Sequence, residues 1–278
     1  MNQTTLARDV TLAGTSLHEG HVVTMALKPA AAGSGITLVR TDKGGARIAV
    51  HPRNIRDVQR RTLLVENNAE VHTVEHVLAA LYGLGVDNAV IELSAAEPPA
   101  GDGSAHEFVK LVEQAGLKEL PAPRREFTPT APFEVVDGKA RIRIEPAAGG
   151  LQVEYTLDYG VPFMPRSTVS FAVTPETFRR EIGPARTFCL EAEAKALQAM
   201  GFGKGANTQN TLVVSPKGPL DNTLRFADEY ARHKLLDVVG DLAVTGLRLN
   251  ARVVAERSGH SQNQQLAREV RRQYEQAN

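Results

Sequence analysis

The sequence predicts two similar α+β units joined by a proline-containing linker. Each half holds several strand-like segments, then a helix with a histidine in its early turns, a strand and a last helix. His76 and His233 hold equivalent places in this order. The linker, 120–125, has two prolines within three residues, which cannot lie inside a helix and favour an extended connection. We therefore expect domains over 1–120 and 127–278, with both histidines in one cleft if the halves face each other.

The composition is that of a folded protein from a reducing compartment. Hydrophobic residues make up 42% of the 278 residues, which is enough for a sizeable core. Lys plus Arg equal Asp plus Glu at 32 each, so no net basic charge favours nucleic acid as a partner. The one cysteine, Cys189, excludes an intramolecular disulfide. Because no signal peptide or bilayer-spanning stretch is recognisable, we expect a cytoplasmic protein.

In the first half, short strands are predicted before two helices. The helix over 73–82 is predicted by apolar residues that share one face, and Gly83 or Gly85 would end it. Ser104 and Glu107 form a capping-box pattern, which predicts a helix from there to Gly116. The strands, predicted from apolar or alternating runs, cover 22–27, 36–40, 46–50, 62–65 and 86–93.

The second half repeats this pattern. Clean alternation over 151–157 predicts a half-buried strand. Thr174 before Pro175 marks the start of a helix, with Gly183 at its end. The remaining predicted elements are helices over 192–200, 227–244 and 262–278, and a strand over 247–255.

The helix over 227–244 carries a candidate metal-binding pair. His233, Asp237 and Asp241 lie one turn apart on one face, and an imidazole and a carboxylate at that spacing can hold one metal ion. A lone pair of this kind is more often an exposed ion pair. Here the apolar neighbours indicate a largely buried helix, in which polar groups need partners. A metal ion would satisfy them.

The segment 72–76 supplies the remaining groups of the predicted site. It reads His-x-x-Glu-His, the inverted zinc-protease pattern, in which both histidines bind zinc. We prefer a second interpretation, in which only His76 binds the metal and His72 faces solvent. The reason is that His233 and Asp237 already provide two of the three protein ligands of a catalytic zinc. Glu75 is then the candidate general base for metal-activated water.

Other residues could complete a hydrolytic site. His260 follows Gly259, which allows a tight turn, and could donate a proton to a leaving amine, with Asp241 orienting it in its charged form. Lys234 and Thr187 could stabilise an oxyanion or a substrate phosphate. Cys189 is interpreted as an inert thiol. The histidines without a convincing partner, interpreted as structural or solvent-facing, are His18, His21, His51 and His106.

Eight short motifs occur in a fixed order and spacing along most of the chain. They are Ser16–Gly20, Thr73–His76, Gly83–Asn88, Asp102–Ala105, Ala185–Phe188, Leu224–Phe226, His233–Asp237 with Gly240–Asp241, and Ser258–His260. With these motifs the chain resembles the UDP-3-O-acyl-N-acetylglucosamine deacetylases of lipid A biosynthesis. The resemblance implies two α+β domains, each a sheet layered with two main helices, and an active site between them.

The resemblance also implies a set of roles. His76, His233 and Asp237 would hold Zn²⁺, or Fe²⁺, since two imidazoles and a carboxylate suit either ion. The other roles are a general base for Glu75, a general acid for His260 oriented by Asp241, oxyanion stabilisation for Thr187, and substrate contact for Lys234. Water would attack the acetamide carbonyl and release acetate. Further candidates for substrate contacts are Phe188, Lys139 and Tyr159.

Three departures from the family pattern concern the substrate. His72 stands where a small polar residue is usual, Cys189–Leu190 replaces Gly-Phe, and Gln209 replaces an acid within 205–210. The last two lie beside the acyl-chain passage implied between Thr187 and about Leu212, so they leave acyl length and substrate identity open. The alternatives are a deacetylase for a different N-acyl sugar and a non-catalytic, zinc-binding regulatory homologue. We expect a monomer, and an acylated substrate is compatible with transient contact with the inner-membrane surface.

Overall fold

The computed structural model describes residues 1–278 and contains two five-stranded sheets. In the first sheet, two antiparallel pairings are followed by one parallel and one antiparallel pairing. Its strands, in spatial order, are β2 (Val10–Thr15), β3 (Val22–Pro29), β9 (Ala89–Leu93), β4 (Ile36–Arg40) and β5 (Ala46–Ala49).

The second sheet repeats the first strand for strand. Its pairings run antiparallel, antiparallel, parallel and antiparallel, and its late strand again lies at the centre. Its strands, in spatial order, are β12 (Phe133–Asp137), β13 (Ala140–Pro146), β20 (Ala251–Glu256), β14 (Leu151–Leu157) and β15 (Ser167–Ala172). The expected α+β fold of two similar units is therefore confirmed.

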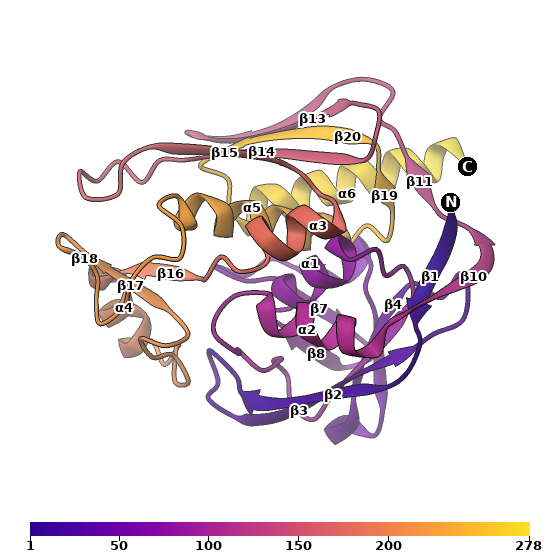
Figure 1. Ribbon diagram of the computed structural model, residues 1–278, viewed down its shortest axis with the longest axis horizontal. Coiled ribbons are helices and arrows are strands. Elements are labelled where there is room, and N and C mark those ends of the chain that lie inside the picture. The colour runs from indigo at the N-terminus through magenta and orange to yellow at the C-terminus, as the bar shows by residue number, and fades with distance from the viewer.

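The helices form two inner layers between the sheets (Figure 1). In the first unit they are α1 (Glu75–Gly83) and α2 (His106–Ala115), and in the second α5 (Glu229–Ala243) and α6 (His260–Ala277). A short helix, α3 (Pro175–Thr177), begins at the expected cap, Thr174, and continues as a π-helical turn over Phe178–Ile182. One contiguous apolar core includes both sheets and the helices between them.

Each unit carries an insertion that the sequence patterns did not define. The first lies between β5 and α1 and is a three-stranded sheet of β6 (Ile55–Arg56), β7 (Leu63–Glu66) and β8 (Ala69–His72). The second precedes α5 and projects at the left of Figure 1. Its elements are β16 (Phe188–Leu190), α4 (Glu191–Ala199), β17 (Leu212–Ser215) and β18 (Gly218–Pro219).

The expected linker is extended, and most of it is also paired: β10 (Leu117–Pro123) runs antiparallel to β1 (Asn2–Leu6) in a sheet of only two strands, where prolines are tolerated on an edge. One local prediction is wrong. The capping box at Ser104 does not form. Instead the Ser104 hydroxyl donates to Asp102 and accepts from the N–H of His106, at 2.6 and 3.0 Å. The remaining short strands are β11 (Glu126–Phe127) and β19 (Arg248–Leu249).

The two units also meet through the half-buried carboxylate of Asp87. Asp87 accepts from Nε of Arg124 and Nε of Arg248, at 2.9 and 2.7 Å.

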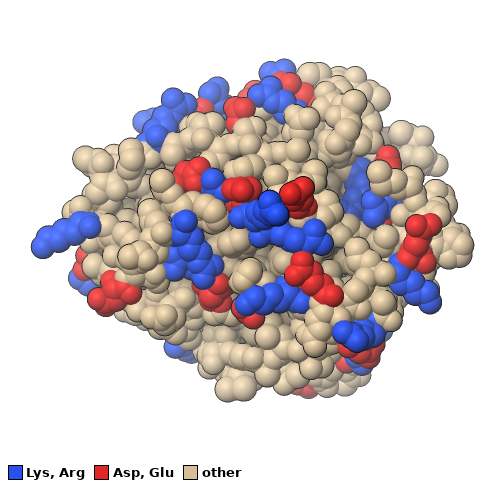
Figure 2. All heavy atoms as spheres, in the orientation of Figure 1, with Lys and Arg blue, Asp and Glu red and all other residues tan.

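On the surface, Lys and Arg are interspersed with Asp and Glu over the face drawn in Figure 2. None of the helices is both long and apolar enough to cross a membrane.

Close contact between α1 and α5 depends on Gly240. A Cβ at this position would lie 2.1 Å from the carbonyl oxygen of Glu75, far inside contact distance. Glycine in the middle of a helix normally costs about 1 kcal/mol relative to alanine, so its presence here has a packing reason. Because α1 carries Glu75 and His76 while α5 carries His233 and Asp237, this crossing brings the predicted metal ligands together.

We expect Gly240→Ala to destabilise the protein by about 1–3 kcal/mol, the usual cost of overpacking a core. The sign of the change in unfolding free energy decides the question, because glycine to alanine in an unobstructed helix stabilises the protein. Denaturant unfolding measures it, with Ala243→Gly at the end of the same helix as the control for helix propensity alone. A Gly240→Ala protein that is more stable than the wild type would show that α1 and α5 leave enough space for a methyl group.

Candidate active site

Three buried side chains from the crossing helices form a group with metal-ligand geometry. The donor atoms of His76, His233 and Asp237 all lie within 4.8 Å of one another. Nε2 of His76 and Nε2 of His233 are 3.7 and 3.5 Å from the same oxygen, Oδ1 of Asp237. Two imidazole nitrogens and one carboxylate oxygen converging on one point are the ligand set of a catalytic zinc, which leaves a coordination position open.

The surroundings prepare these groups to bind a cation. A carbonyl oxygen can only accept, so the 3.0 Å contact between Nδ1 of His233 and the Ala185 carbonyl fixes the proton on Nδ1 and leaves Nε2 free. Burial lowers the pKa of His233 to about 4, which keeps the ring neutral. Burial by itself would raise the pKa of Asp237. Neighbouring groups instead hold this pKa well below its usual range, and the strongest effect among them comes from Lys234, whose Nζ lies 2.5 Å from Oδ2 of Asp237. The residues present therefore fit a divalent cation.

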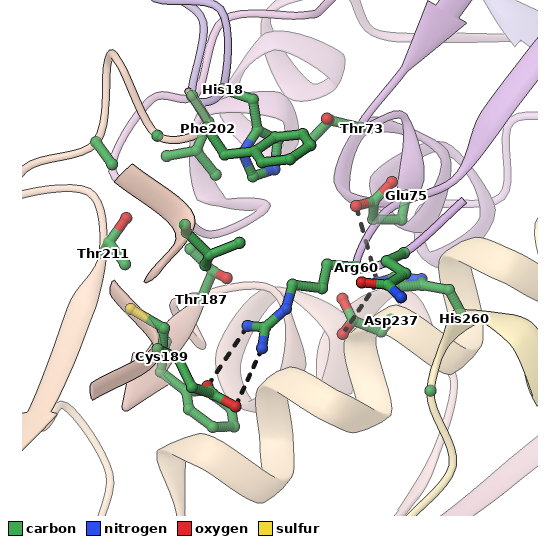
Figure 3. Close-up of a pocket in the computed structure, with 18 of the residues that line it drawn as sticks. His18, Arg60, Thr73, Glu75, Thr187, Cys189, Phe202, Thr211, Asp237 and His260 are labelled. Carbon is green, nitrogen blue, oxygen red and sulfur yellow. Dashed lines mark hydrogen bonds and ion pairs between the residues drawn. The ribbon is translucent and has the colours of Figure 1, made fainter. Parts of the chain in front are cut away.

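The candidate base and acid face each other beside this group. Figure 3 shows Glu75, Asp237 and His260 pointing toward one another. Nε2 of His260 lies 4.0 Å from Oε1 of Glu75 and 3.8 Å from Oδ2 of Asp237. Burial raises the pKa of Glu75, which favours a proton acceptor stronger than an exposed carboxylate. Burial lowers the pKa of His260, but the carboxylates of Asp241 and Asp237 outweigh it and raise the pKa to about 9.

Asp241 holds His260 in place. Its Oδ2 accepts from Nδ1 of His260 and from Nδ2 of Asn263, both at 2.9 Å, and its side chain is fully buried. The expected orientation of His260 by Asp241 is thus present in the geometry. The imidazole is charged at neutral pH and its Nε2 faces the cavity, as a proton donor requires.

Thr62 is a member of the site that the sequence analysis missed. Its N–H donates to Oε2 of Glu75 at 3.1 Å, and its hydroxyl donates to Oδ1 of Asp241. The same hydroxyl accepts from Nε2 of Gln264 at 2.9 Å, and the side chain is fully buried. Thr62 therefore ties the candidate base to the residue that orients the candidate acid. A threonine at the start of a strand gives no sequence signal for such a role.

Thr187 is fixed by a turn from the first unit. Its N–H donates to the carbonyl of Gly103 at 2.8 Å, and its own carbonyl accepts from Leu212 at 2.9 Å. A Cβ on Gly103 would lie 1.9 Å from the carbonyl oxygen of Asn210, so this close approach needs glycine. The Asp-Gly-Ser-Ala motif of the first unit and the Ala-Arg-Thr-Phe motif of the second therefore contact each other directly.

A cavity of about 810 Å³ opens over these residues, at the upper end of the range of ligand pockets. Of the 32 residues that line it, ten are hydrophobic. The predicted site residues among them are Glu75, His76, Tyr159, Thr187, Phe188, His233, Lys234, Asp237 and His260.

Some of the remaining candidate residues line the cavity, and one lies outside it. Tyr159 and Phe188 have ring centroids 5.6 Å apart on one wall of the cavity. Lys139 lies in the exposed turn between β12 and β13, outside the lining, and its contact with substrate stays a prediction. Cys189 lines the cavity, and burial raises the pKa of its thiol, which favours the inert form.

One of the histidines is placed differently from our expectation. His72 is not solvent-facing but 4% exposed, because it ends β8 and its Nε2 lies 3.2 Å from Oε1 of Glu19. It is not part of the metal-ligand group, which agrees with the preferred interpretation of 72–76. His18 has no hydrogen-bond partner at its buried Nδ1, as expected, but it lines the cavity, and its ring packs edge-on against Phe202 at 5.8 Å.

Comparison with known proteins identifies the family. The sequence model of the family described as UDP-3-O-acyl N-acetylglycosamine deacetylase matches residues 3–272. Several curated relatives carry the name UDP-3-O-acyl-N-acetylglucosamine deacetylase. The relative from Anaeromyxobacter dehalogenans (strain 2CP-C) is 42% identical over 270 residues, which cover 97% of this chain and 87% of the relative.

Two further relatives carry the same name. The relative from Phenylobacterium zucineum (strain HLK1) is 39% identical over 273 residues, covering 96% of this chain and 92% of its own length. The relative from Nitratidesulfovibrio vulgaris (strain Hildenborough) is 39% identical over 266 residues, covering 95% and 85%. With the family match over nearly the whole chain, these similarities show that the protein belongs to the UDP-3-O-acyl N-acetylglycosamine deacetylase family.

Proposed function

We propose that this protein hydrolyses the N-acetyl group of UDP-3-O-acyl-N-acetylglucosamine, releasing acetate, in lipid A biosynthesis. The observation that carries the proposal is the arrangement of one buried carboxylate, Glu75, and one charged imidazole, His260, which face each other beside a three-residue metal-ligand group. The names of the relatives supply the substrate.

The proposed cofactor is Zn²⁺, held by His76, His233 and Asp237, with Fe²⁺ as the alternative that the same donors accept. A bound divalent cation supplies a Lewis acid that polarises the acetamide carbonyl and makes water more acidic. The remaining chemistry belongs to side chains of this chain.

We assign each step of the hydrolysis to a side chain of the site. Glu75 takes a proton from water, whose oxygen attacks the carbonyl carbon. Thr187 donates a hydrogen bond to the oxyanion that develops. His260 then gives its proton to the amide nitrogen, the C–N bond breaks, and acetate and the free amine leave. Lys234, on the cavity wall beside Asp237, is the proposed contact for the polar part of the substrate.

Two alternatives remain to be separated from this proposal. A non-catalytic, zinc-binding regulator needs neither Glu75 and His260 beside the ligand group nor a positioned Thr187, so these features favour an enzyme. A deacetylase for another N-acyl sugar has the same chemistry, and the polar lining of the cavity keeps it as the second candidate. Monomeric state and membrane contact stay predictions.

We expect the zinc-loaded protein to release acetate from UDP-3-O-acyl-N-acetylglucosamine much faster than from UDP-N-acetylglucosamine, since the acyl chain contributes binding only in the first. Colorimetric or enzymatic detection of acetate measures both rates. Equal rates, or a preference for the unacylated sugar, would favour the second candidate, and no acetate from either substrate would exclude both.

Loss of a ligand and loss of the base have different expected effects. His76→Ala should abolish both tight metal binding and turnover, because two ligands remain of three. Glu75→Gln should keep the metal and lower turnover by roughly two powers of ten or more, the usual contribution of a positioned base. Metal analysis and the acetate assay measure the two quantities separately.

His51→Ala, at a half-buried histidine outside the cavity, is the control for histidine loss in general. A metal-free His76→Ala protein with full activity would refute the metal-dependent mechanism.

Removing the Thr62 hydroxyl should loosen Asp241, and with it the candidate acid His260, while the backbone N–H that donates to Glu75 remains. We expect Thr62→Val to lower kcat about 10–100-fold, the usual effect of losing a residue that orients a ligand or catalytic group, with a much smaller change in KM. Thr62→Ser, which keeps the hydroxyl, should recover most of the activity. Thr245→Val removes another fully buried hydroxyl, one that donates to Leu242 away from the cavity, and controls for stability. Equal kcat in Thr62→Val and Thr62→Ser would contradict the role.

A further inference from the structure

A buried ion pair holds the segment that carries Thr187. Arg186 is 5% exposed, and Glu229, the first residue of α5, is fully buried. Nε of Arg186 donates to Oε1 of Glu229 at 2.8 Å, and Nη2 donates to Oε2 at 3.1 Å. The guanidinium therefore binds both carboxylate oxygens, which is the strong, bidentate geometry for such a pair.

Further hydrogen bonds complete the surroundings of this pair. The N–H of Arg186 itself donates to Oε1 of Glu229 at 3.1 Å, and the N–H of Arg225 donates to Oε2 at 2.6 Å. The guanidinium also donates to Oδ1 of Asn222 and to the carbonyl of Thr223, at 2.8 and 2.6 Å. Because Glu229 binds the backbone of residue 186 as well as its side chain, it fixes the path of the chain at this point.

The two residues that flank Arg186 both contribute to the candidate site. The carbonyl of Ala185 accepts from Nδ1 of His233 at 3.0 Å, which leaves Nε2 of that ring for a cation. On the other side of Arg186, Thr187 lines the cavity (Figure 3). Glu229 and His233 lie one turn apart on α5, so this helix holds the segment 185–187 at two points of one face. Neither Arg186 nor Glu229 lines the cavity, so any effect on the chemistry passes through their neighbours.

We propose that Arg186 and Glu229 are positioning residues of this enzyme, which orient the metal ligand His233 and the oxyanion donor Thr187 together. The inference rests on the proposed deacetylation and adds two residues outside the cavity lining. Residue 186 is bonded directly to the residues on either side of it. A displacement of residue 186 would therefore move the Ala185 carbonyl away from His233 and turn Thr187 away from the substrate carbonyl.

The same pair could serve only to stabilise the fold. Removing one partner of a buried ion pair is strongly destabilising, so a loss of activity alone would not distinguish the two roles. Metal affinity and kcat per zinc-loaded site do distinguish them. A residue that only stabilises the protein changes how much of it folds and leaves these two properties of the folded protein unchanged.

The first measurement is the affinity for Zn²⁺ by competition with a chromogenic chelator. Arg186→Lys keeps the charge but loses the bidentate geometry, and it should weaken Zn²⁺ binding about 10–100-fold, the usual effect of disturbing a group that orients a metal ligand. The matched control is Arg248→Lys. Arg248 also donates from Nε to a carboxylate, that of Asp87, and from Nη1 and Nη2 to carbonyls, but it lies outside the cavity. This control should bind Zn²⁺ as tightly as the wild type.

The second measurement is a double-mutant cycle on kcat for acetate release from UDP-3-O-acyl-N-acetylglucosamine at saturating Zn²⁺, with active sites counted by metal content. Arg186→Lys alone should lower kcat about tenfold or more, because it misplaces an oxyanion donor. In the Thr187→Val protein, which already lacks that donor, the same change should lower kcat much less. A purely structural role predicts the same factor in both backgrounds, since independent effects multiply.

Arg186→Gln/Glu229→Gln leaves no unpaired buried charge and replaces Arg186→Lys if that protein does not fold. It should change both quantities in the same direction. Wild-type Zn²⁺ affinity in the folded variant, or an equal loss of kcat in both backgrounds, would overturn the positioning role and leave the deacetylase proposal intact. A zinc-loaded wild-type protein that releases no acetate would instead refute the deacetylase proposal, and the Zn²⁺ affinities would still test the orientation of His233.

Discussion

The site depends on how closely α1 and α5 cross. His76 is the second residue of α1, and His233 and Asp237 lie one turn apart on α5, so no single element holds the ligand group. The helices approach because Gly240 presents only hydrogen to the backbone of Glu75. A side chain at this position would separate the metal ligands and the base at once. The close packing of α1 against α5 therefore determines both the core at this point and the geometry of the site.

The matching sheets explain why the two histidines meet. Both sheets share the same pairing pattern, and the helix that precedes the late central strand carries a ligand in each unit. When two such units pack helix against helix, equivalent positions face each other (Figure 1). The two insertions break this symmetry: β6–β8 supplies Thr62 and Arg60, and the segment around α4 supplies Phe202 and Glu193. A symmetric frame positions the metal ligands, while unequal insertions shape the cavity.

Sequence patterns were sufficient where the relevant spacing is local. The helical repeat places His233 and Asp237 on one face, and the five residues from His72 to His76 hold the candidate base beside a ligand. The patterns failed where partners are far apart in the chain. Thr62 and Asp241 are 179 residues apart, and nothing near either residue signals their contact. The strand β10 resembled a linker because its only partner, β1, lies at the other end of the first unit.

Charge balance links these contacts to the need for a cation. The buried group contains the carboxyl groups of Glu75, Asp237 and Asp241, against the ammonium of Lys234 and the imidazolium of His260. With all three carboxyl groups ionised, one negative charge lacks a partner, and a buried charge of this kind is costly. Burial raises the pKa of Glu75, which disfavours its ionised form unless a positive charge lies nearby. A base must be ionised to act, and a divalent cation beside Asp237 favours that state. Under the proposed function, a cation held by the candidate ligands would therefore also keep Glu75 ready to accept a proton.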